Sequence, residues 1–132
     1  MPTESFLVET MITGTSAELL VGATLDPAHG YVLTLAAGGV LTEILKDSVS
    51  MILPVSDDDI RSALQQLNIW PLLSGYRGAA PANVQSIIDS VRGVQDYVLT
   101  HRPFEVEINP LMCGPDRAIA ADALITTGDT ND

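Results

Sequence analysis

Alternating hydrophobic and polar positions predict three strands in the first third of the chain. Phe6–Met11, Glu18–Leu25 and Tyr31–Leu35 repeat with the period of two that strands show, and turn residues separate them. Strands joined by short turns favour an antiparallel meander. The glycine pair Gly38-Gly39 follows, and residues 40–47 fit either a strand or a short helix.

The middle of the chain has the longer period of helices. Ser56 is a candidate N-cap, and three acids after it stand where the helix macrodipole favours negative charge. A metal site is the alternative for these acids, but a helix start explains both their position and their sign. An irregular connector is expected over Trp70–Gly78. Pro81 is expected near the first turn of a second, longer helix with the apolar stripe Val84, Ile87, Ile88, Val91, Val94 and Val98.

Alternation returns in Phe104–Met112 and Ala118–Ile125, on either side of the turn Gly114–Arg117. Strands, two helices and a closing hairpin together predict an α+β domain, with an antiparallel sheet packed against the helices. The domain is expected over residues 1–125, and residues 126–132 form a polar tail.

Composition limits the possible partners. Hydrophobic residues make up 46% of the 132 residues, enough for a real core, and the formal net charge is −11. This acidity argues against nucleic acid and against anionic membrane surfaces as partners. No signal peptide or membrane span is visible, so a cytoplasmic protein is expected. The lone Cys113 excludes an internal disulfide and is expected to be inert.

The closing hairpin carries the candidate chemistry. In a strand, side chains two residues apart share a face, so Glu107 and Asn109 are expected to point the same way. Counting outward from the turn puts Asn109 opposite Asp122, on that same face. Two carboxylates and a carboxamide are ligands that Mg²⁺ accepts. An ordinary solvent-exposed sheet face is the alternative, and spacing alone favours it. Pro110 within the strand predicts an edge position or a bulge.

An ordered set of short motifs runs along residues 6–125: Leu7-Val-Glu9, Glu18-Leu-Leu-Val-Gly22, Asp26-Pro27, Gly38-Gly39 with Glu43, Leu45-Lys-Asp47, Pro54, Pro71–Gly78, Glu107-Ile-Asn-Pro-Leu111 and Asp122-Ala123. This set resembles the C-terminal subdomain of the ATP-grasp module in nucleoside-diphosphate-forming acyl-CoA synthetases. The ADP-forming acetate–CoA ligase type is the most similar, and succinyl-CoA synthetase beta subunits are more distant.

The resemblance implies roles for single residues. Glu9 would lie on the strand that meets the adenine of ATP, and Glu18 would accept hydrogen bonds from the ribose hydroxyls. Asn109 and Asp122 would bind the Mg²⁺ that bridges the nucleotide phosphates, with Glu107 beside them. Gly38-Gly39 would form a turn near the phosphates, where a missing Cβ permits close approach. The alternatives are exposed strand acids for the glutamates and a simple strand end for the glycines.

Two departures from the family pattern qualify the implied activity. Related ligases often carry an arginine where this chain has Met51, which puts catalysis in doubt. The basic half of an ATP-grasp site, the CoA-binding domain and the phosphorylated histidine are not in this sequence. We therefore expect part of an ADP-forming acyl-CoA synthetase, with the missing subdomain as partner and the chain alone inactive. The alternative is an inactive stand-alone interaction or regulatory module, whose open edge a homodimer could cover.

Overall fold

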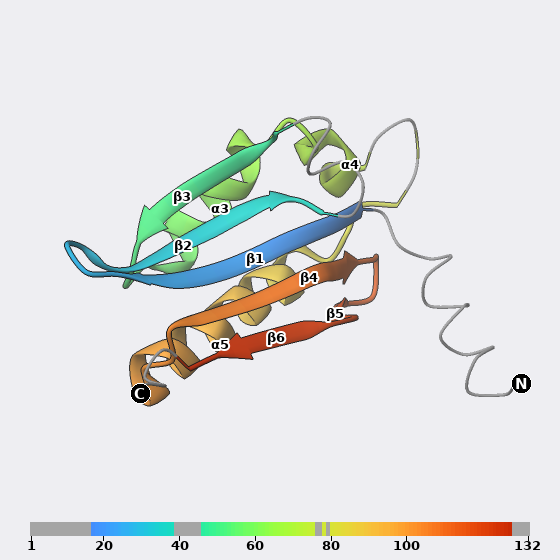
Figure 1. Cartoon of the computed structure of the whole chain (residues 1–132). Helices are drawn as coiled ribbons and strands as arrows, with labels where there is room; N and C mark the ends of the chain where they lie inside the picture. The colour runs from blue at the N-terminus through green and yellow to red at the C-terminus, as the bar shows by residue number, and fades with distance from the viewer. Residues whose placement is uncertain (1–16, 39–45, 76–77, 79, 128–132) are drawn as a thin grey trace, which may run out of the picture.

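The computed structural model describes residues 17–38, 46–75, 78 and 80–127. Within them, an antiparallel sheet forms one layer and the helices form a second layer on one of its faces (Figure 1). The strand order is β3-β2-β1-β4-β5, and β6 also pairs with β4. This arrangement confirms the predicted α+β architecture, with the described helices all on one face of the sheet.

The first described hairpin joins β1 (Ala17–Asp26) to β2 (Gly30–Ala37), and β3 (Ser48–Ile52) pairs with β2. At the turn, the Asp26 carboxylate accepts the Ala28 N–H at 2.7 Å, and Gly30 has a φ of 85°. The strands predicted over residues 18–25 and 31–35 are therefore confirmed. The strand predicted over residues 6–11 and the uncertain element over residues 40–45 lie outside the described residues.

Helix α3 (Asp57–Gln66) begins as its acidic N-terminus predicts. Ser56 Oγ accepts the Asp59 N–H at 3.1 Å, and Asp59 Oδ2 accepts the Ser56 N–H at 3.0 Å. This reciprocal capping box satisfies N–H groups that a helix start would otherwise leave without partners. Along the helix, Ile60 and Leu64 are buried in the core.

The prediction of an irregular connector was wrong for residues 70–74, which form the short helix α4 (Trp70–Ser74). Pro71 stands in its first turn, where a missing N–H costs nothing. Gly75 ends the helix with a φ of 105°. The N–H of Ile69, the residue before the helix, donates to the buried Asp47 carboxylate at 3.0 Å. That contact is long-range, so local pattern gave no sign of it.

Helix α5 (Val84–His101) is the longer helix that the apolar stripe predicts, and five of the six stripe residues are buried, Val84 being half-buried. Its N-cap is Asn83, whose Oδ1 accepts the Ser86 N–H at 3.0 Å. Pro81 stands two residues before this N-cap, close to the first turn as predicted. At the other end, the Arg102 guanidinium lies 4.9 Å from the centre of the Tyr31 ring.

The closing hairpin has one long and two short strands. β4 (Glu105–Cys113) pairs with β5 (Ala118–Ala120) and then with β6 (Ala123–Thr126). The single strand predicted over residues 118–125 was thus wrong in one respect, because Ala121 and Asp122 interrupt it. The interruption lies opposite Asn109 and Pro110 of β4.

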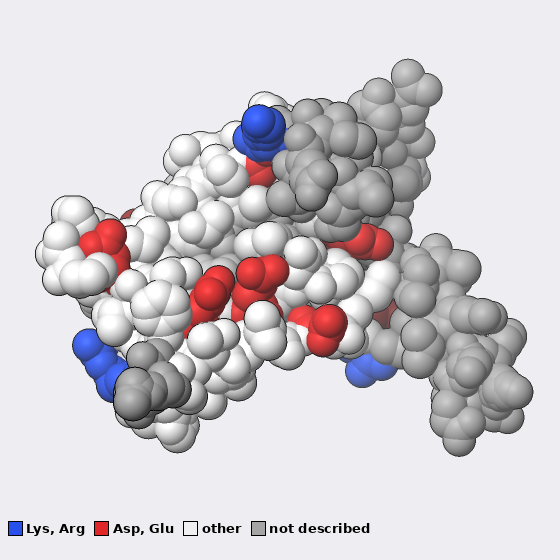
Figure 2. Space-filling model, viewed as in Figure 1, with Lys and Arg blue, Asp and Glu red and all other residues white. Residues whose placement is uncertain are grey.

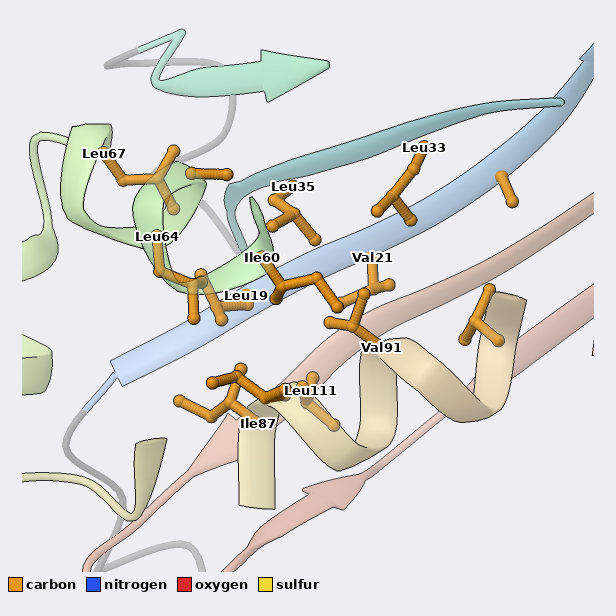
Figure 3. Close-up of a cluster of buried hydrophobic side chains, with 14 of the residues drawn as sticks. Leu19, Val21, Leu33, Leu35, Ile60, Leu64, Leu67, Ile87, Val91 and Leu111 are labelled. Atoms are coloured by element: carbon orange, nitrogen blue, oxygen red, sulfur yellow. The ribbon is translucent and has the colours of Figure 1, made fainter. Parts of the chain in front are cut away.

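The core lies between the sheet and the helices. Figure 3 shows Leu19 and Val21 of β1 and Leu33 and Leu35 of β2 directed toward Ile60 of α3 and Val91 of α5. Glu18 and Leu20 are half-buried and alternate with the buried Leu19 and Val21, so they belong to the opposite, outer face. Among the described residues, no helix is both long and apolar enough to cross a membrane.

Candidate functional site

The outer face of the sheet is acidic. Glu105 and Glu107 alternate along β4 with the core-facing Val106 and Ile108, and Glu18 stands on the same outer face of β1. The described strands carry no lysine or arginine. Figure 2 shows acidic groups across the middle of this face and basic groups only toward its margins. An anionic ligand here would need a cation supplied from outside the sheet.

Asn109 and Asp122 face each other across the hairpin, as counting from the turn predicts. The Asn109 N–H donates to the Asp122 carbonyl oxygen at 3.2 Å, and the next pair closes with Ala121 N–H to Pro110 carbonyl at 3.0 Å. Asp122 is exposed, and its Oδ1 accepts the Ala123 N–H at 2.9 Å. That bond holds Oδ1 in place and so limits the rotation of the whole carboxylate.

Pro110 marks a bulge in β4. Leu19 of β1 pairs with Leu111 and Val21 pairs with Ile108, so two residues of β4 stand opposite the single Leu20. The predicted alternative of an edge strand was wrong, because β4 lies between β1 and the short strands. Bulges re-aim side chains and occur often beside functional sites. Here the bulge contains Asn109.

The same bulge limits the simple alternation argument. Ile108 and Leu111 both pack against the core although three positions separate them. Strict alternation therefore ends after Ile108, and the shared face of Glu107 and Asn109 no longer follows from spacing alone. Glu107 itself is half-buried, opposite Gly22 on one side and Leu124 on the other.

The donor set suits a hard cation that keeps most of its water. Within the described residues no three His, Cys, Asp or Glu side chains converge as a metal-binding group. Asn109 and Asp122 would thus supply one amide and one carboxylate oxygen, with Glu107 nearby on the same strand. Mg²⁺ is commonly held in this way, by one or two protein oxygens, waters and substrate phosphate. The residues present fit Mg²⁺ bound together with a nucleotide.

Glu18 lies away from Glu107 along the outer face of the sheet. It stands opposite Met112, whereas Glu107 stands opposite Gly22, four positions farther along β1. Four positions correspond to about 13 Å of strand, so Glu18 and Glu107 could contact different parts of one extended ligand. Glu9, predicted to approach adenine, lies outside the described residues, as does Gly39.

Gly38 is required by the chain's own backbone. Its N–H donates to the Glu18 carbonyl at 2.8 Å. A Cβ at this position would lie 2.8 Å from the Leu19 carbonyl carbon and 3.0 Å from the Leu19 nitrogen. Close packing of β1 against the end of β2 therefore explains this glycine without any ligand.

Asp47 has a structural role that the sequence alone did not indicate. Its buried carboxylate accepts the N–H groups of Asn68 and Ile69 at 2.7 and 3.0 Å, and its carbonyl accepts the Ala37 N–H at 2.9 Å. These bonds join the start of β3 to the end of β2 and to the turn between α3 and α4. No local pattern could reveal partners more than twenty positions away.

Cys113 has the properties of an inert thiol, as predicted. Its side chain is buried, and burial, with a smaller contribution from the Glu18 carboxylate, raises the pKa of the thiol to about 12. Nucleophilic cysteines need a thiolate near neutral pH, which this environment disfavours.

Comparison with known proteins decides the family. A family model described as an ATP-grasp domain matches residues 2–127. The chain belongs to the ATP-grasp family. This confirms the predicted resemblance, and the acidic sheet face described above is accordingly a face of an ATP-grasp domain.

The similar proteins are ADP-forming acid–CoA ligases. Acetate–CoA ligase [ADP-forming] II subunit beta from Pyrococcus furiosus is 31% identical over 112 residues, which cover 82% of this chain and 48% of that protein. Acetate–CoA ligase [ADP-forming] I from Archaeoglobus fulgidus is 32% identical over 109 residues, or 82% of this chain and 16% of that protein. This ATP-grasp chain thus spans about half or less of the length of these relatives.

A solved structure has the same fold. The dinucleotide-forming acetyl-coenzyme A synthetase 1 of Candidatus Korarchaeum cryptofilum superimposes with a TM-score of 0.79 at 27% sequence identity, covering 84% of this chain and 53% of that one. That protein was solved with coenzyme A and Mg-AMPPCP, and with a phosphohistidine segment pointing toward the nucleotide-binding site.

Proposed function

We propose that this ATP-grasp chain supplies the magnesium–nucleotide edge of an ADP-forming acyl-CoA synthetase. The overall reaction would be acid + CoA + ATP to acyl-CoA + ADP + phosphate. The relatives' names support this reaction class, and the Mg-AMPPCP complex of a similar structure supports the nucleotide. The observation that carries the proposal is the Asn109–Asp122 pair, held across a bulged hairpin on an acidic face.

In this proposal the chain's residues bind and orient. Asn109 and Asp122, with Glu107 beside them, would hold Mg²⁺, which when bound neutralises charge on the phosphoryl oxygens. Glu18 would accept hydrogen bonds from the ribose hydroxyls, while Glu9, Gly38 and Gly39 would border the nucleotide. Positive charge for the phosphates would come from the metal and from another part of the enzyme, because the described strands carry no basic residue.

Replacing the matching segment of the Pyrococcus furiosus beta subunit by this chain tests the proposal. The hybrid, combined with the remaining subunit of that enzyme, should form ATP from acetyl-CoA, ADP and phosphate. Asp122→Ala and Asn109→Ala should each abolish most of this activity. Asp116→Ala is the matched control, because Asp116 is an exposed acid in the same hairpin. Equal loss in all three variants would contradict the assigned roles.

Metal binding by the complete chain offers an independent test if the hybrid does not assemble. Titration with Mn²⁺ alone, followed by water-proton relaxation, should reveal weak binding that Asp122→Ala removes and Asp116→Ala retains. Tight binding of Mg-ATP by this chain alone, measured calorimetrically, would argue against a site that needs a second half.

One observation favours the alternative, an ATP-grasp module that has lost its chemistry. Met51 occupies the position where related ligases often carry an arginine. It lies in β3 opposite Leu33 of β2, half-buried and packed against the core. A hybrid that becomes active only with Met51→Arg would support that alternative. A hybrid that is active with Met51 in place would exclude it.

A further inference from the structure

A pocket of about 520 Å³ opens where helix α5 ends, beside the end of β6 (Figure 1). This volume lies within the range of small-molecule sites, about 300–1,000 Å³. None of its lining residues belongs to the candidate nucleotide site. The lining combines the end of α5, the connector to β4 and the end of β1, and it includes Tyr97, His101, Arg102, Pro103, Phe104 and Leu25.

Arg102 stands at the end of α5 in the left-handed conformation, with a φ of 55° and a ψ of 47°. Glycine usually takes this position in a helix, because a Cβ is unfavourable there. Backbone strain of this kind persists where surrounding contacts hold it, and it occurs often at binding sites. The Arg102 guanidinium lies 4.9 Å from the centre of the buried Tyr31 ring. The Tyr31 hydroxyl in turn donates to the Pro103 carbonyl, so the ring beneath the guanidinium is itself held in place.

The N–H groups of the Arg102 guanidinium are available to a ligand. Stacking on Tyr31 uses the face of the guanidinium and leaves its donors at the edge. Within the part of the chain that the structure describes, no carboxylate or carbonyl oxygen accepts a hydrogen bond from them. The pocket therefore contains a positioned cation with unused donors.

The acids next to the lining residues in sequence are directed elsewhere. Asp26 accepts the Ala28 N–H at 2.7 Å within its own turn. Glu105 belongs to the outer face of the sheet, and Asp96 interacts electrostatically with Arg92, one helical turn away. Among the described residues that line the pocket, none is acidic. The pocket is thus positively charged although the chain has a formal net charge of −11.

Flat rings form much of the remaining surface of the pocket. The rings of Tyr97 and His101 stand one turn apart on α5, with their centroids 4.5 Å apart. Tyr97 is 37% exposed and Phe104 is 43% exposed, so both rings are accessible. Aromatic side chains pack well against other flat rings, and the imidazole of His101 adds an N–H donor. Rings beside an arginine fork fit a planar ring that carries a negative group.

We propose that this pocket binds a small aromatic anion, that is, a phosphate or carboxylate carried on a flat ring. Arg102 would donate two parallel N–H groups to the anion, and the rings of Tyr97, His101 and Phe104 would contact the ring of the ligand. The proposal does not depend on nucleotide or metal binding at the outer face, and it would stand if that site were disproved.

Naphthyl phosphate tests the proposal on the complete chain, with binding followed by NMR. The side-chain signals of Tyr97, His101 and Phe104 should shift as the ligand is added. Naphthol, which lacks the anion, and inorganic phosphate, which lacks the ring, should each bind more weakly by about tenfold or more. Tighter binding of naphthoate than of naphthyl phosphate would assign the pocket to carboxylates, and weaker binding would assign it to phosphates.

Variants of Arg102 separate binding from folding. Arg102→Gly removes the guanidinium together with the unfavourable Cβ, so the variant should fold and should lose affinity by about tenfold or more. Arg102→Lys keeps the charge without the planar fork and should retain part of the affinity. Arg117→Gly is the matched control, because Arg117 is exposed in the turn at the opposite end of β4. Phe104→Ala removes an exposed ring and should weaken binding even if Arg102→Gly does not fold.

Three outcomes would overturn the inference. Equal affinity of the wild type and of Arg102→Gly would show that the anion binds elsewhere. Shifts confined to Glu18, Glu107 and Asn109 would place the ligand on the outer face, and would leave the proposed nucleotide site intact. No shift at millimolar ligand would show that Arg102 serves only to cover the Tyr31 ring.

Discussion

Replacing Gly38 by alanine tests whether the chain's own backbone or a ligand requires this glycine. The added Cβ would lie 2.8 Å from the Leu19 carbonyl carbon and 3.0 Å from both the nitrogen and the oxygen of that residue. All three atoms are backbone, so no rotamer change can relieve the contact. Either β1 or the end of β2 must move, which would strain the hydrogen bond from Gly38 N–H to the Glu18 carbonyl.

The expected cost follows from overpacking. Forcing one extra carbon into a packed site costs about 1–3 kcal/mol. Alanine returns about 0.4–1 kcal/mol by restricting the unfolded chain. We therefore expect Gly38→Ala to lower the free energy of unfolding by roughly 1–2 kcal/mol, which for a chain of this length lowers Tm by roughly 3–10 °C.

Urea unfolding without nucleotide is the appropriate assay. The midpoint should fall while the slope m stays constant, because only the native state is perturbed. Gly93→Ala is the matched control, since its Cβ meets no described atom within 4 Å outside its own turn. It should raise stability by about 0.5–1 kcal/mol through helix propensity. If Gly38→Ala is neutral or stabilising, the steric reasoning fails, and a ligand becomes the better reason for this glycine.

Substitutions at three further positions test other side chains, each by urea unfolding. Gln95→Leu keeps the buried volume but removes the bonds of Gln95 to the Val55 N–H (2.7 Å) and carbonyl (3.3 Å), so a loss of about 1–3 kcal/mol is expected; a neutral result would contradict this. Asp47→Ala should cost about 2–4 kcal/mol because two N–H groups lose a charged acceptor, and Asp47→Asn should cost less. The pKa of Cys113 rises from 9.0 to about 12 on folding, so the native state holds its proton longer than the unfolded chain. Stability from this thiol is complete below pH 9 and should decline by about 1.4 kcal/mol per pH unit up to about 12; Cys113→Ala should remove that decline.

Local rules predicted much of the fold because their partners are close in sequence. The start of α3 follows from Ser56 and Asp59, which cap each other three positions apart. The buried stripe of α5 follows from a period of 3.6 over five turns. The opposition of Asn109 and Asp122 follows from counting outward from a short turn. In each case geometry repeats along the chain, so pattern carries the information.

Long-range contacts were beyond such rules. The Asp47 carboxylate accepts hydrogen bonds from Asn68 and Ile69, twenty-one and twenty-two positions later in the chain. These two donors lie directly before helix α4, which no periodicity indicated. A five-residue helix is too short to show a period. Buried carboxylates are identified by their surroundings, and their surroundings exist only once the chain has folded.

Pro110 shows why the predicted register rests on fewer assumptions than the predicted shared face of Glu107 and Asn109. Counting from the turn assumes only that the two sides of the hairpin keep one register between the turn and Asn109, and the bulge in β4 is absorbed on the β1 side, opposite Leu20. The assignment of faces assumes in addition an unbroken period of two, which fails between Ile108 and Leu111. Proline removes an N–H from the ladder, so the failure falls at the residue after Asn109. Asn109, the candidate metal ligand, and Pro110, which predicts a bulge, are therefore adjacent at the point where the pairing of β4 with β1 is interrupted, while the pairing toward Ala121 and Asp122 continues.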